Sequence, residues 1–286
     1  MPIDPVFAPA ALADFKALYP ERPGRIDHGL AGHPAFALDA LVDLATRLDP
    51  AQVEYNRGDL PVGVDPKADV ANGLDIAATI RSIEDNGSWM VLKFVERDPV
   101  YKAILEETLH ELRPVVDPTT GPMLKMEGFI FVSSPGSMTP FHFDPEHNIL
   151  LQLRGTKTMT VFPADDPTIA APLQHETFHM GGHRNLPWQD AFLAKGVAVN
   201  LEPGQAVHVP VKAPHFVRNG PSTSISFSIT WRSEWSYREA SAHGLNAILR
   251  RTGIDPAMPA RFPAQNHAKS LAYRAIGKAR TILGKD

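Results

Sequence analysis

The fold of this chain is decided by two stretches, Gly-Ser-Met-Thr-Pro-Phe-His-Phe-Asp at residues 136–144 and Gly-Gln-Ala-Val-His-Val-Pro-Val-Lys-Ala-Pro-His at residues 204–215. The first ends in His142 and Asp144, and the second ends in His215. On a strand, His142 and Asp144 would point to the same side because side chains alternate. Two imidazoles and one carboxylate form the set that holds non-haem Fe(II) on one face and leaves other positions open. We therefore predict a catalytic metal on these three residues, although an isolated His-x-Asp pair more often binds nothing.

The composition is that of a globular protein. The chain has 286 residues, so one large domain with appendages or two small domains fit the usual ~100–200 residues per domain. The formal net charge of -4 provides no electrostatic case for nucleic acid. The absence of cysteine removes disulfides and thiolate metal sites, and it suits a reducing compartment. With no signal-peptide pattern and no apolar run near ~20 residues, we predict a cytoplasmic protein without membrane contact.

Hydrophobic periodicity divides the chain into three parts. Residues 1–122 are predicted to form a helical N-terminal part that packs on the core. Over residues 123–232 the period is about two, and short segments separated by turn residues predict a sandwich or barrel. The helical period returns in residues 233–286. The predicted fold class is therefore mainly β with helical flanks.

The individual elements follow from the same periodicity. Helices are predicted at 9–18, 36–48, 75–85, 98–112, 234–251 and 265–283, with the fourth ended by Arg113-Pro114. Strands are predicted at 53–56, 89–95, 126–133, 147–153, 157–162, 196–201, 206–209 and 222–231, with a turn at 58–59.

The spacing of the two stretches resembles the two motifs of the cupin superfamily. The first cupin motif is Gly, five residues, His-x-His, three or four residues, Glu, six residues and Gly. The second is Gly, five residues, Pro-x-Gly, two residues, His, three residues and Asn. The matching positions are Gly136, His142, Asp144, Asn148 and Gly155, then Gly204, Pro210, Lys212, His215 and Asn219. Three of them depart from the pattern, because Asp144 replaces a His, Asn148 the Glu, and Lys212 a Gly.

The first two departures make the ligand set similar to that of the JmjC branch of cupins, the Fe(II)- and 2-oxoglutarate-dependent oxygenases. Asparaginyl hydroxylase of hypoxia signalling and bacterial cupin-like proteins are the most similar in pattern. The resemblance covers roughly residues 123–231 and implies a double-stranded β-helix (jelly-roll) core. It also implies that Thr139, Asn148 and Lys157 bind the cosubstrate, with Lys157 on the far carboxylate of 2-oxoglutarate.

Lys157 is informative without the resemblance. Alternation places it on one side of a strand together with Met159 and Val161. A lysine in that position either snorkels at the sheet edge or pairs with an anion inside the protein. Beside a metal triad we expect the anion.

The segment 222–231 alternates cleanly between hydroxyl and apolar side chains. Ser224, Ser226, Ser228 and Thr230 would face one way. Small polar groups on a central strand indicate the lining of a ligand cavity, whereas on an edge strand they would form an exposed polar face. The resemblance implies that Thr230 or Ser228 lies near the metal-bound end of the cosubstrate.

Three histidines, His175, His179 and His183, recur every four residues. On one helix they would share a face and could bind a second metal. Gly181-Gly182 and Pro187 favour instead a loop inserted between the two motifs, either near the site mouth or plainly on the surface. Near the mouth, the candidates for substrate contact are Arg184, Asn185 and Trp188. His147 and His208 are interpreted as structural.

The C-terminal part is rich in basic residues and carries an apolar set suited to dimerisation. The basic residues are Arg250, Arg251, Arg261, Lys269, Arg274, Lys278, Arg280 and Lys285, which suit a solvated helix face or an acidic partner. The apolar residues are Leu245, Ile248, Leu249, Leu271, Ile276 and Ile282. Because C-terminal helices mediate dimers in some JmjC hydroxylases, the resemblance favours a homodimer.

The predicted function is an oxygenase that uses Fe(II), O2 and 2-oxoglutarate to hydroxylate a C–H bond of a peptide or protein side chain or of a small molecule. Two alternatives remain. A cupin metalloenzyme of another class, such as an isomerase or a dioxygenase independent of 2-oxoglutarate, would keep the three ligands without needing Lys157. A non-catalytic cupin that binds or regulates would have no need of all three ligands.

Overall fold

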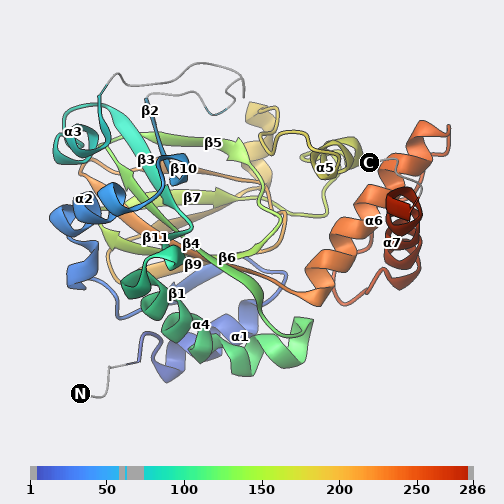
Figure 1. Cartoon of the computed structure of the whole chain (residues 1–286), viewed down its shortest axis with the longest axis horizontal. Helices are drawn as coiled ribbons and strands as arrows, with labels where there is room; N and C mark the ends of the chain where they lie inside the picture. Colours follow the sequence, from blue (N-terminus) through green and yellow to red (C-terminus); the bar gives the residue numbers. More distant parts are fainter. Residues whose placement is uncertain (1–4, 58–61, 63–73, 283–286) are drawn as a thin grey trace.

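Two antiparallel sheets face each other in the computed structural model, which describes residues 5–57, 62 and 74–282 (Figure 1). The strands of the larger sheet are β1 Gly24–Asp27, β2 Val53–Arg57, β3 Ser88–Lys93, β4 Leu124–Ser133, β6 His147–Arg154, β9 Gln205–Val209 and β11 Ser224–Arg232. The strands of the smaller sheet are β5 Met138–His142, β7 Lys157–Val161, β8 Val197–Leu201 and β10 His215–Asn219. The orders are β1-β9-β6-β11-β4-β3-β2 and β5-β10-β7-β8. The predicted jelly-roll core with helical flanks is confirmed.

Apolar side chains from both sheets fill the space between them. Leu150 and Val207 from the larger sheet pack with Met159, Val199 and Val217 from the smaller one. Strands β6 and β11 are buried along almost their whole length, because the smaller sheet covers one face and helices cover the other. Neither strand therefore has the solvent-exposed face that a half-solvated strand keeps. The six strands predicted between residues 123 and 232 lie within two residues of their observed bounds.

The N-terminal part contributes strands as well as helices to this core. β3 pairs with β4, β2 pairs with β3, and β1 pairs with β9 on the opposite edge. The two predicted segments 53–56 and 89–95 are thus strands, whereas β1 was not predicted. The division at residue 122 stays a prediction, and the predicted turn at 58–59 lies outside the described residues.

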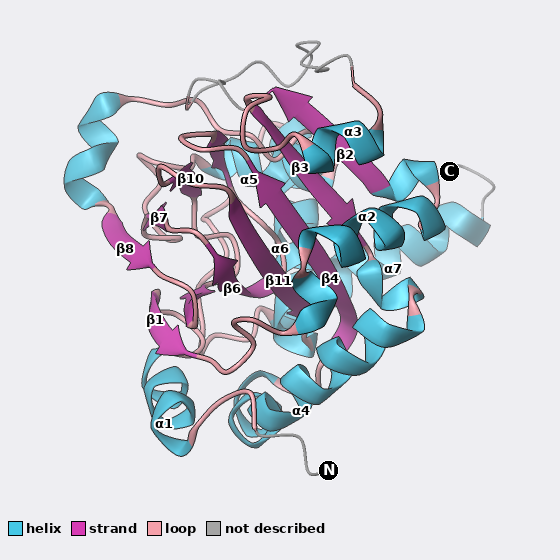
Figure 2. Ribbon diagram, turned by 90° about the vertical axis from the view of Figure 1, so that its left-hand side faces the viewer, coloured by secondary structure: helices cyan, strands magenta, loops and turns pink. Residues whose placement is uncertain are grey.

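Helices cover the outer face of the larger sheet (Figure 2). They are α1 Pro9–Leu18, α2 Leu38–Arg47, α3 Ile76–Arg81 and α4 Pro99–Thr120. Their buried residues, such as Phe15, Leu41 and Leu109, share one apolar core with Ile149 and Phe227 of the sheet.

The end predicted for the fourth helix is wrong. Its start is as expected, because the Asp98 side chain accepts the Val100 N–H and Pro99 occupies the first helical position. The helix continues through Pro114 to Thr120. A proline inside a helix removes one backbone hydrogen bond. Here the apolar stripe of Leu112 and Val116 continues into the core, and this burial offsets the loss.

Three further helices lie toward the C-terminal side of the fold. They are α5 Pro172–His179, α6 Glu234–Arg251 and α7 His267–Ile282. α7 packs on α6, where Gly244 allows the Tyr273 ring to come within the space that a Cβ would occupy. Leu245 is buried, whereas Leu271 and Ile282 are 70% and 75% exposed. The predicted end at 283 and Lys285 lie outside the described residues.

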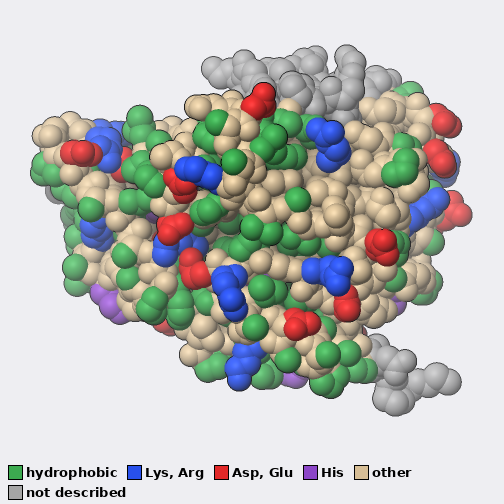
Figure 3. Space-filling view, turned by 180° about the vertical axis from the view of Figure 1, so that it is seen from behind, with side chains coloured by type: hydrophobic (Ala, Val, Ile, Leu, Met, Phe, Trp, Pro, Cys, Tyr) green, Lys and Arg blue, Asp and Glu red, His purple; other side chains and the backbone are tan. Residues whose placement is uncertain are grey.

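Neither the helices in the described part of the chain nor the face shown in Figure 3 gives a sign of a membrane span or a charged patch. None of the helices in the described part of the chain combines the length and apolarity that crossing a bilayer requires. On the face shown in Figure 3, acidic and basic side chains are interspersed and the apolar ones are scattered. That face therefore has no large single-sign field.

Candidate functional site

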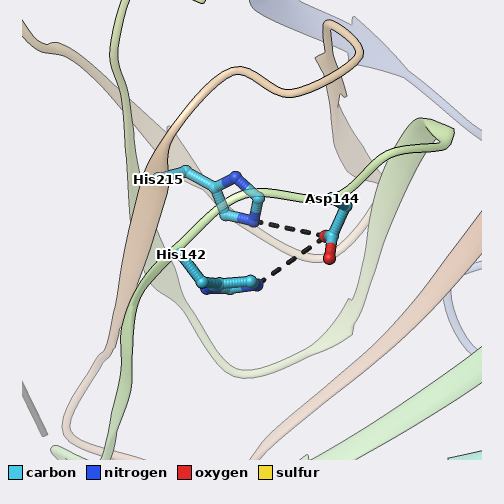
Figure 4. Close-up of side chains that lie close together, drawn as sticks. All are labelled: His142, Asp144 and His215. Carbon is cyan, nitrogen blue, oxygen red and sulfur yellow. Dashed lines mark ion pairs between the residues drawn. The ribbon is translucent and has the colours of Figure 1, made fainter. Parts of the chain in front are cut away.

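A cavity of about 410 Å³ opens between the two sheets, and the three predicted ligands line it. His142 ends β5 and His215 begins β10, and the register of these paired strands sets the two residues opposite each other. Asp144 follows shortly after β5. Figure 4 shows the three side chains pointing toward one another.

The distances are those of a metal-binding group. Asp144 Oδ2 lies 3.7 Å from His142 Nε2 and 3.6 Å from His215 Nε2. The two imidazole centroids are 4.3 Å apart. One ligand atom from each residue lies within 4.8 Å of the other two. Across the described ranges, no other group of three His, Cys, Asp or Glu side chains meets that condition.

Both imidazoles are held in the tautomer that a metal requires. His142 Nδ1 lies 2.7 Å from the Pro140 carbonyl, and His215 Nδ1 lies 2.9 Å from the Ala213 carbonyl. A carbonyl only accepts, so each Nδ1–H donates and each Nε2 keeps its lone pair for a metal. Burial, together with the nearby His142, lowers the pKa of His215 to about 4, so this ring is neutral at pH 7.

Asp144 is placed by contacts with distant residues rather than by strand alternation. β5 ends at His142, so the prediction that Asp144 shares its strand is wrong. The Lys212 N–H donates to the Asp144 carbonyl at 2.7 Å, and Arg184 Nη1 donates to Asp144 Oδ1 at 2.7 Å. Burial alone would raise the pKa of the Asp144 carboxyl, but Arg184 and the two histidines outweigh burial and hold that pKa well below its usual range. The carboxylate is therefore ionised and presents Oδ2 to the histidines.

Arg184 reaches the site because its segment runs alongside β5. Asn185 forms a β-bridge with His142, and the Leu186 N–H donates to the Phe141 carbonyl at 2.9 Å. Arg184 lines the cavity and its side chain is 52% exposed. Trp188, another predicted substrate contact, instead packs among Phe141 and other aromatic rings away from the cavity lining.

We expect the Arg184→Gln variant to bind Co2+ about tenfold more weakly than the parent, because losing a group that orients a metal ligand typically costs 10–100-fold. Isothermal titration of the purified chain with Co2+ measures this. Arg218→Gln, which removes an exposed arginine of β10, serves as the control and should leave the affinity unchanged. Equal affinities for all three proteins would show that Arg184 does not orient Asp144.

Lys157 lies in the same cavity at the start of β7. Its side chain is only 5% exposed, and within the described residues no anionic group offsets this burial. Burial lowers its pKa to about 7. β7 pairs with β10 so that Lys157 lies opposite Asn219, four residues from His215. A buried ammonium without an anion is costly, so this position favours an anionic ligand.

The other predicted cosubstrate residues also line the cavity. They are Thr139, Asn148, Ser228 and Thr230. Ser228 Oγ donates to Asn148 Oδ1 at 2.8 Å, and Thr230 Oγ1 donates to the Glu127 carbonyl at 3.1 Å. The structure thus brings together the three predicted ligands and the five predicted cosubstrate residues, whereas of the three candidate substrate contacts only Arg184 lines the cavity.

The alternative of an exposed edge strand for residues 222–231 is wrong. β11 lies between β6 and β4, and all its residues are buried. Ser228 and Thr230 reach the cavity. Ser224 and Ser226 instead form hydrogen bonds with Gln152, at 2.9 and 3.0 Å.

The sequence did not reveal the part of the cavity lining that β3 and β4 contribute. Trp89, Val91 and Lys93 of β3 and Phe129 and Phe131 of β4 line it. Their every-second-residue spacing was the available signal. This spacing does not reveal which face of each strand meets the cavity, because that depends on the pairing of β4 with β11 and of β3 with β4.

The three-histidine metal site is not formed. His175 and His179 lie on the helix α5, so the predicted loop is wrong for these two residues. The helix ends before Gly181-Gly182 as expected, and His183 lies beyond it. The rings of His175 and His179 pack on His243 of α6, with centroids 5.0 and 5.8 Å apart.

His147 and His208 have the structural surroundings expected of them. His147 stacks on Trp231 and bonds Ser233 Oγ at 2.9 Å. His208 Nδ1 donates to the Arg22 carbonyl at 2.9 Å.

Comparison with known proteins identifies distant relatives. No family model matches the chain. It is 30% identical over 109 residues to Jumonji C domain-containing protein 5 of Drosophila melanogaster, covering 32% of this chain and 25% of that protein. It is 30% identical over 105 residues to Lysine-specific demethylase JMJ30 of Arabidopsis thaliana, covering 35% and 24%. The chain thus matches about a quarter of the length of each relative.

Solved structures match over much more of the chain. The structure of ycfD of Escherichia coli has a TM-score of 0.53 at 19% identity, covering 92% of this chain and 66% of that one. YcfD, a ribosomal oxygenase from Escherichia coli, in complex with cobalt and 2-oxoglutarate has a TM-score of 0.50 at 17% identity, covering 92% and 65%. At these identities the likeness shows the shared fold.

Proposed function

We infer that this chain, a JmjC-type cupin in fold and in metal motif, is an oxygenase that depends on Fe(II) and 2-oxoglutarate. Lys157 is the observation that carries the proposal. An isomerase or another metal cupin would use the triad. It would not need a lysine that is buried in the same cavity and whose charge no anionic group of the described residues offsets. The register of β7 on β10 separates Lys157 from His215 by four residues, roughly 13 Å of strand. A lysine side chain and a five-carbon dicarboxylate together suit that span.

The residues present fit the metal. Two imidazoles and one carboxylate on one side of the cavity are the donors of non-haem Fe(II) oxygenases, which leave positions open for cosubstrate and oxygen. His142 Nε2, His215 Nε2 and Asp144 Oδ2 would hold the ion. When bound, Fe(II) and 2-oxoglutarate supply the oxidation, in which the 2-oxo acid becomes succinate and CO2 while one oxygen atom of O2 enters a substrate C–H bond.

The chain's own residues bind and orient the cosubstrate. The Lys157 ammonium neutralises the far carboxylate of 2-oxoglutarate, and Thr139 and Asn148 provide further hydrogen bonds to the cosubstrate. Ser228 and Thr230 lie near the metal-bound end. The apolar residues Leu150, Met159 and Val217 line the same cavity and exclude water from it, which strengthens every charge interaction inside.

The test is a turnover assay with Fe(II), O2 and 2-oxoglutarate that measures succinate and CO2. We expect slow succinate formation without substrate and faster formation when the substrate is present. Metal binding without any response to 2-oxoglutarate would favour a cupin enzyme of another class. A chain that binds neither metal nor 2-oxoglutarate would favour a non-catalytic cupin.

The substrate that accepts the oxygen atom is less closely defined than the reaction. We propose a C–H bond of a peptide or protein side chain or of a small molecule. The ribosomal oxygenase and the lysine-specific demethylase JMJ30 named above support the protein side chain. Homodimer formation through α6 and α7 and a cytoplasmic location stay predictions, and light scattering of the purified chain tests the dimer.

The affinity for 2-oxoglutarate should fall as the pH rises. Before 2-oxoglutarate binds, burial lowers the pKa of Lys157 to about 7. The ammonium that pairs with the dicarboxylate is therefore lost above that pH. We expect the KM for 2-oxoglutarate to rise by up to about tenfold per pH unit above pH 7. Lys157→Arg keeps its charge at every pH, so its KM should not show this rise. The same rise in both proteins would exclude Lys157 as its origin.

A further inference from the structure

The residue at the glycine position of the second motif, Lys212, lies in a backbone conformation that favours glycine. Its φ is +58°, in the left-handed region. It belongs to a tight turn that the Ala213 N–H closes on the Pro210 carbonyl at 3.0 Å. A positive φ inside such a turn is usually met by glycine. A lysine held in this conformation points to a role for its side chain.

That side chain is fully buried and paired. Lys212 is 1% exposed, and its Nζ lies 2.8 Å from Glu239 Oε2 of α6. Glu239 also accepts from His243 Nε2 at 2.9 Å through its other oxygen. Burial would raise the pKa of Glu239, but Lys212 and His243 outweigh it and hold that pKa well below its usual range. The pair is therefore ionic, although burial lowers the pKa of Lys212 to about 8.

The backbone of the same residue contacts the metal site. The Lys212 N–H donates to the Asp144 carbonyl at 2.7 Å. The turn leads directly into His215, whose Nδ1 donates to Ala213 inside the turn. Lys212 therefore joins two ligand segments through its backbone and joins both of them to α6 through its ammonium.

A second connection runs from α6 to Asp144 through α5. Arg250 of α6 pairs with the buried Glu176 of α5 at 2.7 Å, and His175 and His179 pack on His243. The chain after α5 carries Arg184 to Asp144 Oδ1. Figure 1 shows α5 beside α6. Helix α6 thus supports both the carbonyl and the carboxylate of Asp144.

We propose that Lys212 and Glu239 are positioning residues for the metal centre, through which α6 holds the turn of His215 and the carbonyl of Asp144. The inference rests on the metal centre of the proposed function, but not on its cosubstrate or reaction. It makes α6 a part of the site.

The test compares Co2+ binding by the full chain and its variants, by titration at a temperature where circular dichroism shows each protein folded. Lys212→Gly suits the backbone but removes the ammonium, and Glu239→Gln removes its partner charge. We expect both to bind Co2+ about tenfold more weakly or worse, as for other groups that orient metal ligands. The double variant Lys212→Gly/Glu239→Gln leaves no buried unpaired charge. It should therefore melt at a higher temperature than either single variant while its Co2+ affinity stays weak.

The matched control is Arg47→Met, which breaks the ion pair of Arg47 with Asp98 between α2 and α4. It should lower the melting temperature and leave Co2+ affinity unchanged. If the Lys212 and Glu239 variants, including the double variant, behave like this control, the pair is merely structural and the proposal is overturned. A parent that binds no Co2+ would overturn the metal centre and this inference together. A parent that binds Co2+ but never consumes 2-oxoglutarate would overturn the proposed function alone.

Discussion

Asp144→Ala is expected to lose succinate formation to the level of a reaction without enzyme. The carboxylate is one of the three proposed metal ligands, and its Oδ2 lies within 3.7 Å of both imidazole Nε2 atoms. Loss of a group that only orients a ligand costs 10–100-fold, so loss of a ligand should cost more than about 100-fold in metal affinity and turnover. The measurement is Co2+ binding together with succinate formation under saturating 2-oxoglutarate.

Asp166→Ala is the matched control for that variant. Asp166 is also an ionised carboxylate in an ion pair, with Lys195 at 2.7 Å, but it does not line the cavity. It should retain the metal affinity and turnover of the parent. An Asp144→Ala variant that still bound Co2+ as tightly as Asp166→Ala would show that the metal lies elsewhere.

Lys157→Ala is expected to raise the KM for 2-oxoglutarate while leaving Co2+ binding intact. Removing one partner of a buried charge pair costs about 2–5 kcal/mol, which corresponds to roughly 30-fold to 5000-fold in affinity. Lys157 is 5% exposed, so water cannot readily replace its ammonium. Initial rates of succinate formation across a range of 2-oxoglutarate concentrations measure the effect.

A cosubstrate that lacks the far carboxylate sharpens the test of Lys157. 2-Oxopentanoate keeps the metal-binding 2-oxo acid and the chain length of 2-oxoglutarate. The parent should strongly prefer 2-oxoglutarate, and Lys157→Ala should lose most of this preference. Lys195→Ala, which removes an exposed lysine, should keep it. An unchanged preference in Lys157→Ala would mean that another residue recognises the far carboxylate, and the proposed role of Lys157 would be wrong.

These two predictions come from residues that were recognised in the sequence. His142, Asp144 and His215 were recognised because metal ligands need particular side chains at particular spacings, and Lys157 because alternation placed a charge on an apolar side. Six of the eight strands between residues 123 and 232 were recognised from the same alternation, whereas β5 and β10 were not predicted. Both signals depend only on residues that are close together in the sequence. They can therefore be recognised without knowing how the rest of the chain folds.

Other features of the site depended on segments far apart in the sequence. Arg184 lies forty residues from the carboxylate that it binds, and Lys212 lies 27 residues before Glu239. Nothing in the spacing of these residues marks them as partners. The charges meet because α5 and α6 pack together and because the segment after α5 runs along β5.

The sequence by itself determined the three predicted metal ligands, a β sandwich or barrel with helical flanks, and the lysine that makes a dicarboxylate the expected ligand. The jelly-roll class was implied by the resemblance to the cupins. Only the tertiary structure decided that β3 extends the larger sheet so that Trp89, Val91 and Lys93 line the cavity. It also decided that α4 continues past Pro114, and that Lys212, in the turn before His215, pairs with Glu239 of α6. The physical reason is that ligand type and side-chain alternation depend on residues that are neighbours in the sequence. Strand order, helix length and buried ion pairs instead depend on the burial that distant segments offer one another.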